Sequence, residues 1–346
     1  MTSKITLELL DPRDKSWTGF VNTLPDANIF HHPHWMTFIA ECYHHNPFVL
    51  AAKDNNGIIL AGIPLIETNC LLVSKKLISL PFSDHCSPLY SKNYALNALL
   101  DYLAALYKKE KQRTLELRWE LPSHPNITPY SHHVLSTITI APSLEETFYN
   151  IHKRTRKYIR VSQKKGLTVK IGQSPEFIQE FYKLQILTRQ KHGVPVQPKR
   201  FFDLLGKRII ARDLGHILLA YKDQQCVAGK IILHWNNTLT FKYSASDQHY
   251  LDLYPNYLLS WTAIKWGVEN NYQLIDMGRS ANSNTNLRQY KLKWGAVEKP
   301  LIYSTYSTTP SPISTRTTMK FINFLIKHTP RWVCRVSGEI LYRHSA

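Results

Sequence analysis

Two segments of this chain share one pattern of apolar and polar positions, and each is predicted to form a β-hairpin. In residues 48–65 and 217–233 an apolar run ends at a Lys-Asp pair, and a second apolar run follows it. Short apolar runs on either side of turn residues are typical of paired strands. The two segments align with one short gap, which favours an internal duplication over the turn chemistry that unrelated hairpins share.

The return strand of each hairpin contains an Ala-Gly pair, with the glycines at Gly62 and Gly229. Glycine weakens the interior of a strand, so its presence at matching positions predicts a β-bulge or the close approach of another part of the chain. Each hairpin also follows a segment with helical periodicity, residues 34–43 in the first case and 199–210 in the second.

Strand-like and helix-like periods alternate along the rest of the chain. Further strands are predicted at residues 5–10, near 77, and at 115–119, 134–140, 167–171, 239–246 and 274–276, and further helices at 94–109, 144–165, up to 191, and from 255. This alternation predicts an α/β (α+β) fold of two lobes, each a mixed, mostly antiparallel sheet covered by helices. We expect the lobes to cover residues 1–143 and 144–306.

The composition changes after residue 306. Residues 307–315 are rich in Ser, Thr and Pro, and residues 316–343 carry apolar side chains interspersed with Arg and Lys. These features predict a linker and a basic, amphipathic helical tail over 307–346. Such a tail suits the surface of an anionic membrane, and it equally suits packing on the second lobe.

Lys and Arg total 43 against 25 Asp and Glu, which gives a formal net charge of +18. This charge favours an anionic partner, such as RNA, a phosphate-bearing or lipid-linked substrate, or a membrane surface. The five cysteines are scattered and contain no CxxC pair, which argues against a disulfide framework or a structural zinc site. No apolar run approaches the ~18 residues of a membrane span, so we expect a cytoplasmic protein, in contact at most with the inner face of the membrane.

Residues 276–295 follow a predicted short strand and are rich in polar side chains. Loops at strand ends commonly hold functional sites. Gly278 permits a turn beside a ligand, Arg279 offers a planar fork for phosphate or carboxylate, and Thr285 is expected to cap the helix that follows. The alternative is a solvated loop followed by a surface helix, on which Lys291 is merely an exposed cation.

The predicted helix over residues 144–165 is amphipathic, with Phe148 and Ile159 among its apolar positions. The opposite face carries five cations: Lys153, Arg156, Lys157, Arg160 and Lys164. This face suits the phosphates of RNA or of a nucleotide-linked or lipid-linked partner, or it is simply a solvated surface.

Two further clusters contain residue types that can bind metal or act as nucleophiles. His31, His32 and His34 lack neighbouring Cys or carboxylate ligands at helical spacing, so no metal site is predicted there. The run Asp84-His85-Cys86 is predicted to be a turn with a half-buried cysteine, because a catalytic Cys and His usually meet from distant positions in the chain.

Several motifs occur together in a characteristic order: Tyr254-Pro255, Asp276-Met-Gly-Arg279 and Leu287-Arg-Gln-Tyr290-Lys291-Leu-Lys-Trp294-Gly295, with His31 to Trp35, Ser79 to Asp84, Arg154 to Arg160 and Lys191 to Pro195 in support. This order resembles the Fem-type transferases and their single-chain, FemAB-like relatives in the GNAT superfamily of acyltransferases, including those of exosortase and exopolysaccharide systems. The resemblance extends over roughly residues 25–305.

The resemblance implies two tandem GNAT-like lobes related by duplication, and attack of an acceptor amine on an activated acyl group. The donor is an aminoacyl-tRNA in the peptidoglycan-bridge enzymes of this family and acyl-coenzyme A in most GNAT enzymes. The coenzyme A loop Q/R-x-x-G-x-G/A is absent from this chain, and residues 163–168 are only a near match.

By the same resemblance, Lys291 stabilises the charge that develops on the acyl oxygen or on the leaving group, where a fixed cation lowers the barrier. The base is left open between water, Asp276 and His192. The other residues assigned to donor or substrate binding are Arg279, Ser280, Asn286, Tyr290, Trp294, Tyr243, Arg156 and Arg160.

The sequence thus predicts an N-acyltransferase that moves an acyl or aminoacyl group to an amine of a cell-envelope, polysaccharide or peptidoglycan precursor. Its cosubstrate is acyl-coenzyme A or aminoacyl-tRNA, and no bound cofactor is expected. The rival within the enzyme class is a coenzyme A-dependent acetyltransferase. From another class, a catalytically inactive basic protein would bind RNA or anionic lipid, but this hypothesis gives no reason for the polar loop and the Tyr-Lys pair to occur together.

Overall fold

The computed structural model describes residues 5–68, 76–109, 114–122, 127–307, 323, 326–327 and 330–342. The described residues of Met1–His133 and Pro300–Pro312 form one compact unit, here called unit 1. Those of Val134–Lys299 and Ile313–Arg343 form a second, called unit 2. A lobe boundary at residue 143 and a tail that starts at residue 307 stay predictions.

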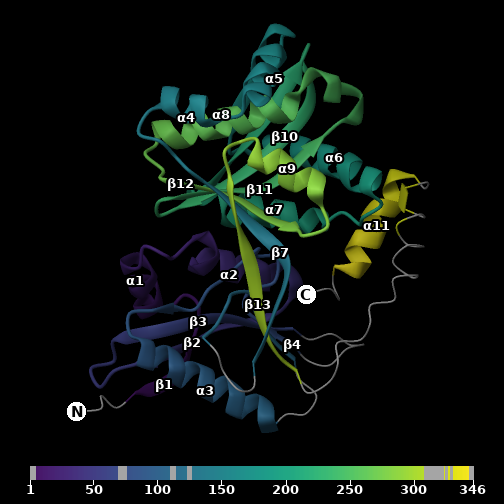
Figure 1. Cartoon of the computed structure of the whole chain (residues 1–346). Helices are drawn as coiled ribbons and strands as arrows, with labels where there is room; N and C mark the ends of the chain where they lie inside the picture. Colours follow the sequence, from purple (N-terminus) through teal and green to yellow (C-terminus); the bar gives the residue numbers. More distant parts are fainter. Residues whose placement is uncertain are drawn as a thin grey trace. The chain divides into compact units, whose positions relative to one another are not determined.

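Unit 1 is a mixed sheet with helices packed on it (Figure 1). Its elements are β1 (Thr6–Leu10), α1 (Lys15–Thr23), η1 (Ile29–His31), α2 (Pro33–Tyr43), β2 (Asn46–Lys53), β3 (Ile59–Thr68), β4 (Lys76–Ile78), β5 (Leu89–Tyr90), α3 (Asn93–Lys109) and β6 (Thr114–Leu117), with parts of β7 (Thr128–Thr139) and β13 (Val297–Ser307). The strand order is β1-β2-β3-β4-β6, and β6 pairs with the last residues of β13. The pairings are antiparallel except between β4 and β6.

Unit 2 repeats this plan with a larger set of helices. Its elements are α4 (Leu144–Asn150), α5 (Lys153–Lys164), β8 (Thr168–Gly172), α6 (Pro175–His192), α7 (Lys199–Arg208), η2 (Ile210–Arg212), β9 (Gly215–Lys222), β10 (Gln225–Trp235), β11 (Thr238–Ser246), η3 (Gln248–Leu253), α8 (Pro255–Glu269), β12 (Leu274–Ala281), α9 (Thr285–Leu292) and α11 (Arg331–Leu341). The strand order is β7-β12-β11-β10-β9-β8. Helices α5 and α8 cover one face, and α6 and α7 cover the other (Figure 1).

The two predicted hairpins are confirmed as β2-β3 in unit 1 and β9-β10 in unit 2. The matching glycines lie under aromatic rings: a Cβ at Gly62 would lie 2.5 Å from Cζ3 of Trp17, and one at Gly229 would lie 2.8 Å from Cδ2 of Phe181. Real Cβ atoms do not approach other heavy atoms so closely. Of the two explanations that the sequence left open, close approach therefore holds at the glycines, and a shift in strand register lies a few residues away in each hairpin.

The helix predicted over residues 144–165 is two helices, α4 and α5, and the prediction of one continuous helix is wrong. Ile151 and His152 interrupt it with extended backbone. The Nδ1 atom of His152 accepts a hydrogen bond from the backbone N–H of Arg154 at 3.2 Å, so His152 caps α5. The backbone N–H of His152 donates to the carbonyl of Lys293 at 3.0 Å, which fixes the break.

The described part of the C-terminal tail packs on unit 2. Helix α11 lies against α6. The Nη2 atom of Arg189 donates to the hydroxyl of Tyr342 at 2.5 Å. A Cβ at Gly338 would lie 1.8 Å from the carbonyl oxygen of Val196, so the helix approaches the backbone beside it closely. Most of residues 307–330 lies outside the described residues. No helix in the described part of the chain is long and apolar enough to cross a membrane.

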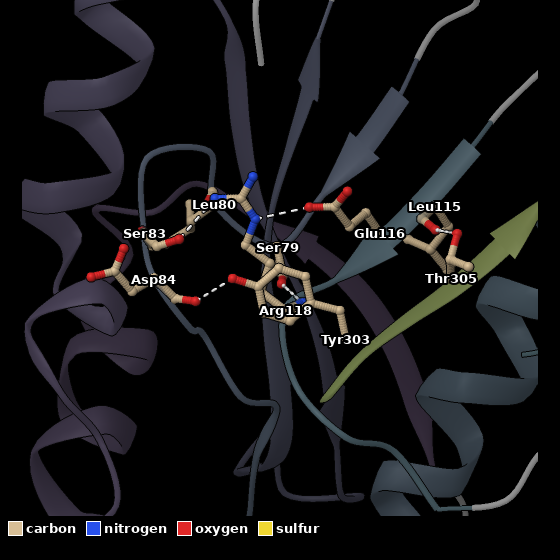
Figure 2. A network of polar contacts seen from close by, with 9 residues as sticks. All are labelled: Ser79, Leu80, Ser83, Asp84, Leu115, Glu116, Arg118, Tyr303 and Thr305. Carbon is tan, nitrogen blue, oxygen red and sulfur yellow. Dashed lines mark hydrogen bonds and ion pairs between the residues drawn. The ribbon is translucent and has the colours of Figure 1, made fainter. Parts of the chain in front are cut away.

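In unit 1, Arg118 holds the loop that follows β4. Figure 2 shows its guanidinium donating to the carbonyl of Ser83 at 2.7 Å, to that of Leu80 at 3.3 Å, and to Glu116 Oε1 at 2.9 Å. Leu80 and Phe82 have positive φ angles of 58° and 62°. Because non-glycine residues rarely adopt this backbone conformation, the charge-assisted bonds of Arg118 offset local strain.

The remaining His and Cys clusters of unit 1 are structural. His31 is buried, its Nδ1 accepts from the backbone of Asn28, and its Nε2 lies 2.9 Å from the carbonyl of Ser87. His32 caps α2. Cys86 is fully buried rather than half-buried as predicted, and burial raises the pKa of its thiol far above the usual range. A thiol in this state is not a nucleophile.

Candidate active site

The candidate site lies in unit 2, where strands β11 and β12 stop pairing. These two parallel strands pair at only three positions, from Thr238 opposite Leu274 to Thr240 opposite Asp276. Beyond this point β11 runs on to Ser246 and β12 to Ala281. Beyond this point β11 no longer pairs with the edge of β12 that faces it, so backbone groups on that edge are available to side chains and ligands.

The segment after Asp276 is the second half of β12, and the prediction that it is a loop is wrong for residues 277–281. The strand is kinked at its centre. Asp276 Oδ1 accepts a hydrogen bond from the backbone N–H of Gly278 at 2.7 Å, and Gly278 has a φ of 75°, which favours glycine. Asp276 is buried at 3% exposure. Its carboxylate thus shapes β12 at the point where the pairing with β11 ends.

Lys291 reaches this kink from α9. Its Nζ donates to the carbonyl of Gly278 at 2.6 Å and to that of Arg279 at 3.2 Å, and the residue is only 5% exposed. The alternative reading of Lys291 as an exposed surface cation is wrong. Helix α9 is capped by Asn284 rather than by Thr285 as predicted, since the Asn284 side chain accepts from the N–H of Leu287 at 3.2 Å.

The neighbours of Lys291 differ in their exposure. Tyr290 hydrogen-bonds through its hydroxyl to Ser260 Oγ on α8 at 3.1 Å, and its ring lies edge-on to Trp294, which is buried. Burial raises the pKa of Tyr290 to about 12, so the phenol is protonated at neutral pH. Ser280 has a buried hydroxyl with no hydrogen-bond partner among the described residues, whereas Asn286 is exposed. Arg279 is half-buried.

The sequence reading missed Lys230, a second buried lysine beside Lys291. It lies on β10 at 5% exposure, its Nζ donates to Ser244 Oγ at 2.8 Å, and it stands 4.5 Å from the ring centre of Phe241. Burial lowers the pKa of Lys230 to about 7, and the charge of Lys291 lowers it in the same direction. The duplicated hairpins carried a signal for this burial. Lys230 follows Gly229 in the second hairpin, and the matching residue after Gly62 in the first hairpin is Ile63, which is fully buried.

Two predicted site residues lie elsewhere in unit 2. The ring of Tyr243 on β11 is edge-on to those of Phe201 and Phe202 on α7. His192 ends α6, and its pKa is lowered by burial and by the neighbouring cations, the nearest in sequence being Lys191. The described contacts therefore place Tyr243 on the α7 face and His192 in a basic environment.

A cavity of about 440 Å³ lies at the end of β11. Its lining includes Ser246 and Asp247 just after the strand, and the side chains of Lys191 and Lys327. A polar cavity with two cations suits an anionic group. It lies at the end of β11 that runs beyond the pairing with β12.

The basic helix α5 presents its cations to solvent, and its buried positions are Thr155, Ile159 and Ser162. Arg156 and Arg160 do not stand free of neighbours, because their guanidinium carbons lie 5.9 and 5.4 Å from the ring centre of Phe148 on α4. Stacking on aromatic rings holds both guanidinium groups in fixed positions.

The near match to a coenzyme A loop is the C-terminal end of α5. The N–H of Gly166 donates to the carbonyl of Gln163 at 3.0 Å, and Gly166 has a φ of 78°. Strand β8 follows it. A phosphate-binding loop of this kind requires the free N–H groups at the beginning of a helix, so this segment is not such a loop.

Residues 147–292 match the model of a family described as acetyltransferase (GNAT) domain. This range contains β11, β12 and α9. A curated relative, UDP-N-acetylmuramoylpentapeptide-lysine N(6)-alanyltransferase of Weissella viridescens, is 24% identical over 170 residues, which are 49% of this chain and 50% of that protein. The aligned part of this chain thus spans about half the length of that relative.

Solved structures of the same fold cover nearly the whole chain. The crystal structure of FemX has a TM-score of 0.70 at 14% identity, over 91% of this chain and 100% of that one. L-PGS from Bacillus licheniformis scores 0.55 at 14% identity (92% and 98%), and a tandem GNAT protein from the clavulanic acid biosynthesis pathway scores 0.51 at 10% identity (89% and 100%). The predicted mixed α/β fold is confirmed. By these comparisons the chain resembles the FemAB-like, GNAT-type acyltransferases in its fold and in the sequence of residues 147–292.

Proposed function

We propose that this protein transfers an aminoacyl group from an aminoacyl-tRNA to an amine of a cell-envelope precursor, in the cytoplasm. The observation that carries the proposal is the buried ammonium of Lys291 on the carbonyls of Gly278 and Arg279 in β12, within the GNAT-matched segment. The alanyltransferase that resembles this chain is named for a lysine acceptor on a UDP-linked muramoyl pentapeptide. The lack of a coenzyme A loop favours tRNA over acyl-coenzyme A as the donor.

The reaction forms one bond and breaks another. The acceptor nitrogen attacks the carbonyl carbon of the aminoacyl ester, a C–N bond forms, and the C–O bond to the terminal ribose of the tRNA breaks. The ribose oxygen leaves as a hydroxyl group, and the amine loses one proton. Negative charge develops on the carbonyl oxygen between these steps, and Lys291 stabilises it as a fixed cation in a site with little water.

Lys230 is our candidate for the proton acceptor. Asp276 is engaged in holding the kink of β12, and His192 lies in a basic environment. An amine with a pKa of about 7 is matched to proton transfer at neutral pH, and Ser244 offers a hydroxyl through which the proton can pass.

This role predicts a pH-dependent effect. In the wild type, turnover should rise with pH through about 7 as Lys230 loses its proton, and Lys230→Met should remove that rise while lowering turnover by roughly 10- to 1000-fold. Turnover measured from pH 5.5 to 9 checks it. A Lys230→Met enzyme that keeps the wild-type profile would exclude Lys230 as the base.

Phosphates of the donor or the acceptor are proposed to bind the cations around the site. Arg156 and Arg160 on α5 and the lysines of the 440 Å³ cavity, Lys191 and Lys327, are the candidates. Arg279, Ser280, Tyr290 and Trp294 are proposed to line the donor's acyl end.

The choice of donor can be tested directly. Purified protein is incubated with the UDP-linked pentapeptide acceptor and either alanyl-tRNA or acetyl-coenzyme A, and acceptor mass is followed by mass spectrometry. The proposal expects an alanyl adduct from the charged tRNA alone. An acetyl adduct would show a coenzyme A-dependent acetyltransferase instead. Consumption of neither donor, also with an amine panel as acceptors, would favour a protein that only binds RNA or anionic lipid.

A further inference from the structure

Two histidines and an aspartate meet in unit 2 at the start of β9 and the end of β10. His216 Nδ1 lies 3.1 Å from His234 Nε2, and His216 Nε2 lies 4.0 Å from Asp213 Oδ1. One nitrogen of each ring and one oxygen of Asp213 lie within 4.8 Å of one another. Asp213 follows η2 in the left-handed conformation, and His216 pairs with Ile232 across the β9-β10 ladder.

The sheet brings these side chains together. His216 is the second residue of β9 and His234 the last but one of β10, so antiparallel pairing places both at the same end of the two strands. The ring of Trp266 on α8 lies over both, with centroid distances of 4.9 and 5.0 Å. The rings are therefore held in place from the side, which lowers the entropic cost of binding a ligand between them.

A second layer of groups orients the first. The hydroxyl of Tyr272 lies 2.8 Å from His234 Nδ1, and Gln173 Nε2 donates to Asp213 Oδ1 at 3.0 Å. When His234 Nδ1–H donates to the tyrosine oxygen, the lone pair of Nε2 faces His216. Metal-binding histidines typically use one ring nitrogen for the metal and donate the other N–H to an oxygen.

The spacing of the donors fits a small transition-metal ion. Two nitrogens that bind tetrahedral zinc at ~2.0–2.1 Å lie about 3.3 Å apart. The observed 3.1 Å between His216 Nδ1 and His234 Nε2 requires only a small adjustment. The Asp213 side chain is 81% exposed, so an ion can enter from solvent and the carboxylate can turn toward it. Two imidazoles and one carboxylate leave a fourth position for water.

We propose that Asp213, His216 and His234 form a binding site for a divalent transition-metal ion, with Zn²⁺ as the ion the donor set suits best. The site would join the end of η2 to β9 and β10 and, through Tyr272, to the residues that precede β12. It is independent of the proposed acyl transfer, whose residues lie further along β12. Because the ion would bind the folded state and not the unfolded state, its binding should stabilise unit 2.

The test uses the full chain with any affinity tag removed and with metal stripped by chelator. Isothermal titration with ZnCl₂ should show one ion per chain, and a saturating excess should raise the melting temperature. His216→Gln and His234→Gln should each weaken Zn²⁺ binding by at least about 10-fold, and Tyr272→Phe by roughly 10-fold. Co²⁺ bound in place of zinc should give the absorption bands of a tetrahedral site.

The matched control is His249→Gln, which alters an exposed histidine that contacts Asp247 at 2.8 Å elsewhere in unit 2. It should leave Zn²⁺ binding unchanged. Asp213→Asn changes an exposed side chain, so it tests the site even where a histidine variant does not fold, and it should weaken binding by about 10-fold. Absence of stoichiometric Zn²⁺ binding, or undiminished binding in Asp213→Asn together with Tyr272→Phe, would overturn the proposal.

Discussion

Two lysines with the same small exposure have different surroundings, and the difference sets their chemistry. Lys291 donates to two backbone carbonyls, whose dipoles favour its charged form. Lys230 donates to the neutral hydroxyl of Ser244 and faces the charge of Lys291. Burying a charge without an opposite charge is costly, so burial lowers the pKa of Lys230 and favours its neutral form.

This burial should make stability depend on pH. The pKa of Lys230 is about 7 in the folded protein, against an ordinary value of 10.5 for lysine. Between these values the unfolded chain holds a proton that the folded chain lacks, so stability falls as pH drops from about 10.5 to about 7 and then levels off. This change in the free energy of unfolding has an upper limit of about 5 kcal/mol, since each unit of pKa difference corresponds to about 1.36 kcal/mol.

Lys230→Met should abolish this dependence. Denaturant unfolding of both proteins is measured at pH 7 and pH 10. The free energy of unfolding of the variant should exceed that of the wild type by most at pH 7 and by much less at pH 10. Equal differences at the two pH values would mean that Lys230 keeps its proton in the folded state.

At the scale of elements, the duplicated hairpins depend on two glycines that admit aromatic rings. Gly229→Ala should cost about 1–3 kcal/mol, because its Cβ would lie 2.8 Å from the ring of Phe181. Gly19→Ala is the control. It lies in α1 with nothing within 4 Å of the new Cβ, and it should stabilise by about 0.5–1 kcal/mol. Urea unfolding of both variants measures the sign of each change in the free energy of unfolding. A Gly229→Ala protein as stable as the wild type would show that Phe181 can move aside.

Periodicity predicted most strands and helices of this chain, because the apolar runs of β2, β3, β9 and β10 are buried on matching patterns. It failed where polar side chains act on the backbone. His152 caps α5 and thereby breaks a continuous helical pattern, and Asp276 bonds to Gly278 within a strand that reads as a loop. Such contacts depend on single side chains, which leave no period in the sequence.

Only part of the candidate site was predicted, because its contacts also depend on single side chains. Lys291 and Tyr290 were placed by their resemblance to a motif, and the kinked strand beneath them supports that placement. Lys230 lies in an apolar run and only tertiary structure shows that its ammonium is near Lys291. His216 at the start of β9 and His234 at the end of β10 are 18 residues apart in sequence, and strand pairing alone brings them together.

At the scale of the molecule, the net charge of +18 predicts salt-dependent binding of RNA. Replacing both Arg156 and Arg160 by Gln should weaken tRNA binding roughly 10-fold at low salt and reduce the salt slope by about 1–2. Filter binding from 50 to 200 mM salt measures both quantities. Lys265→Gln, on an exposed site of α8 paired with Glu269, is the control and should change neither. Parallel slopes for the double variant and the wild type would exclude α5 from the RNA contact.

The C-terminal helix offers a second whole-molecule test. Its packing on α6 accounts for the buried Cys334, while Trp332 and Val336 remain 61% and 47% exposed. Since the described part is docked on unit 2, removal of residues after 310 should leave sedimentation with anionic liposomes nearly unchanged. A loss of sedimentation of more than about 5-fold on truncation would instead assign the tail a membrane role.

The central claim is that Lys291, bound to the carbonyls of Gly278 and Arg279 in β12, stabilises the charge that develops during acyl transfer. The most direct measurement is single-turnover transfer of alanine from alanyl-tRNA to the UDP-linked pentapeptide, followed by mass spectrometry for the wild type, Lys291→Met and Lys293→Met. We predict a loss of roughly 10- to 1000-fold for Lys291→Met and a change of less than about 2-fold for Lys293→Met, whose side chain is only half-buried. A folded Lys291→Met protein with wild-type turnover would contradict the account.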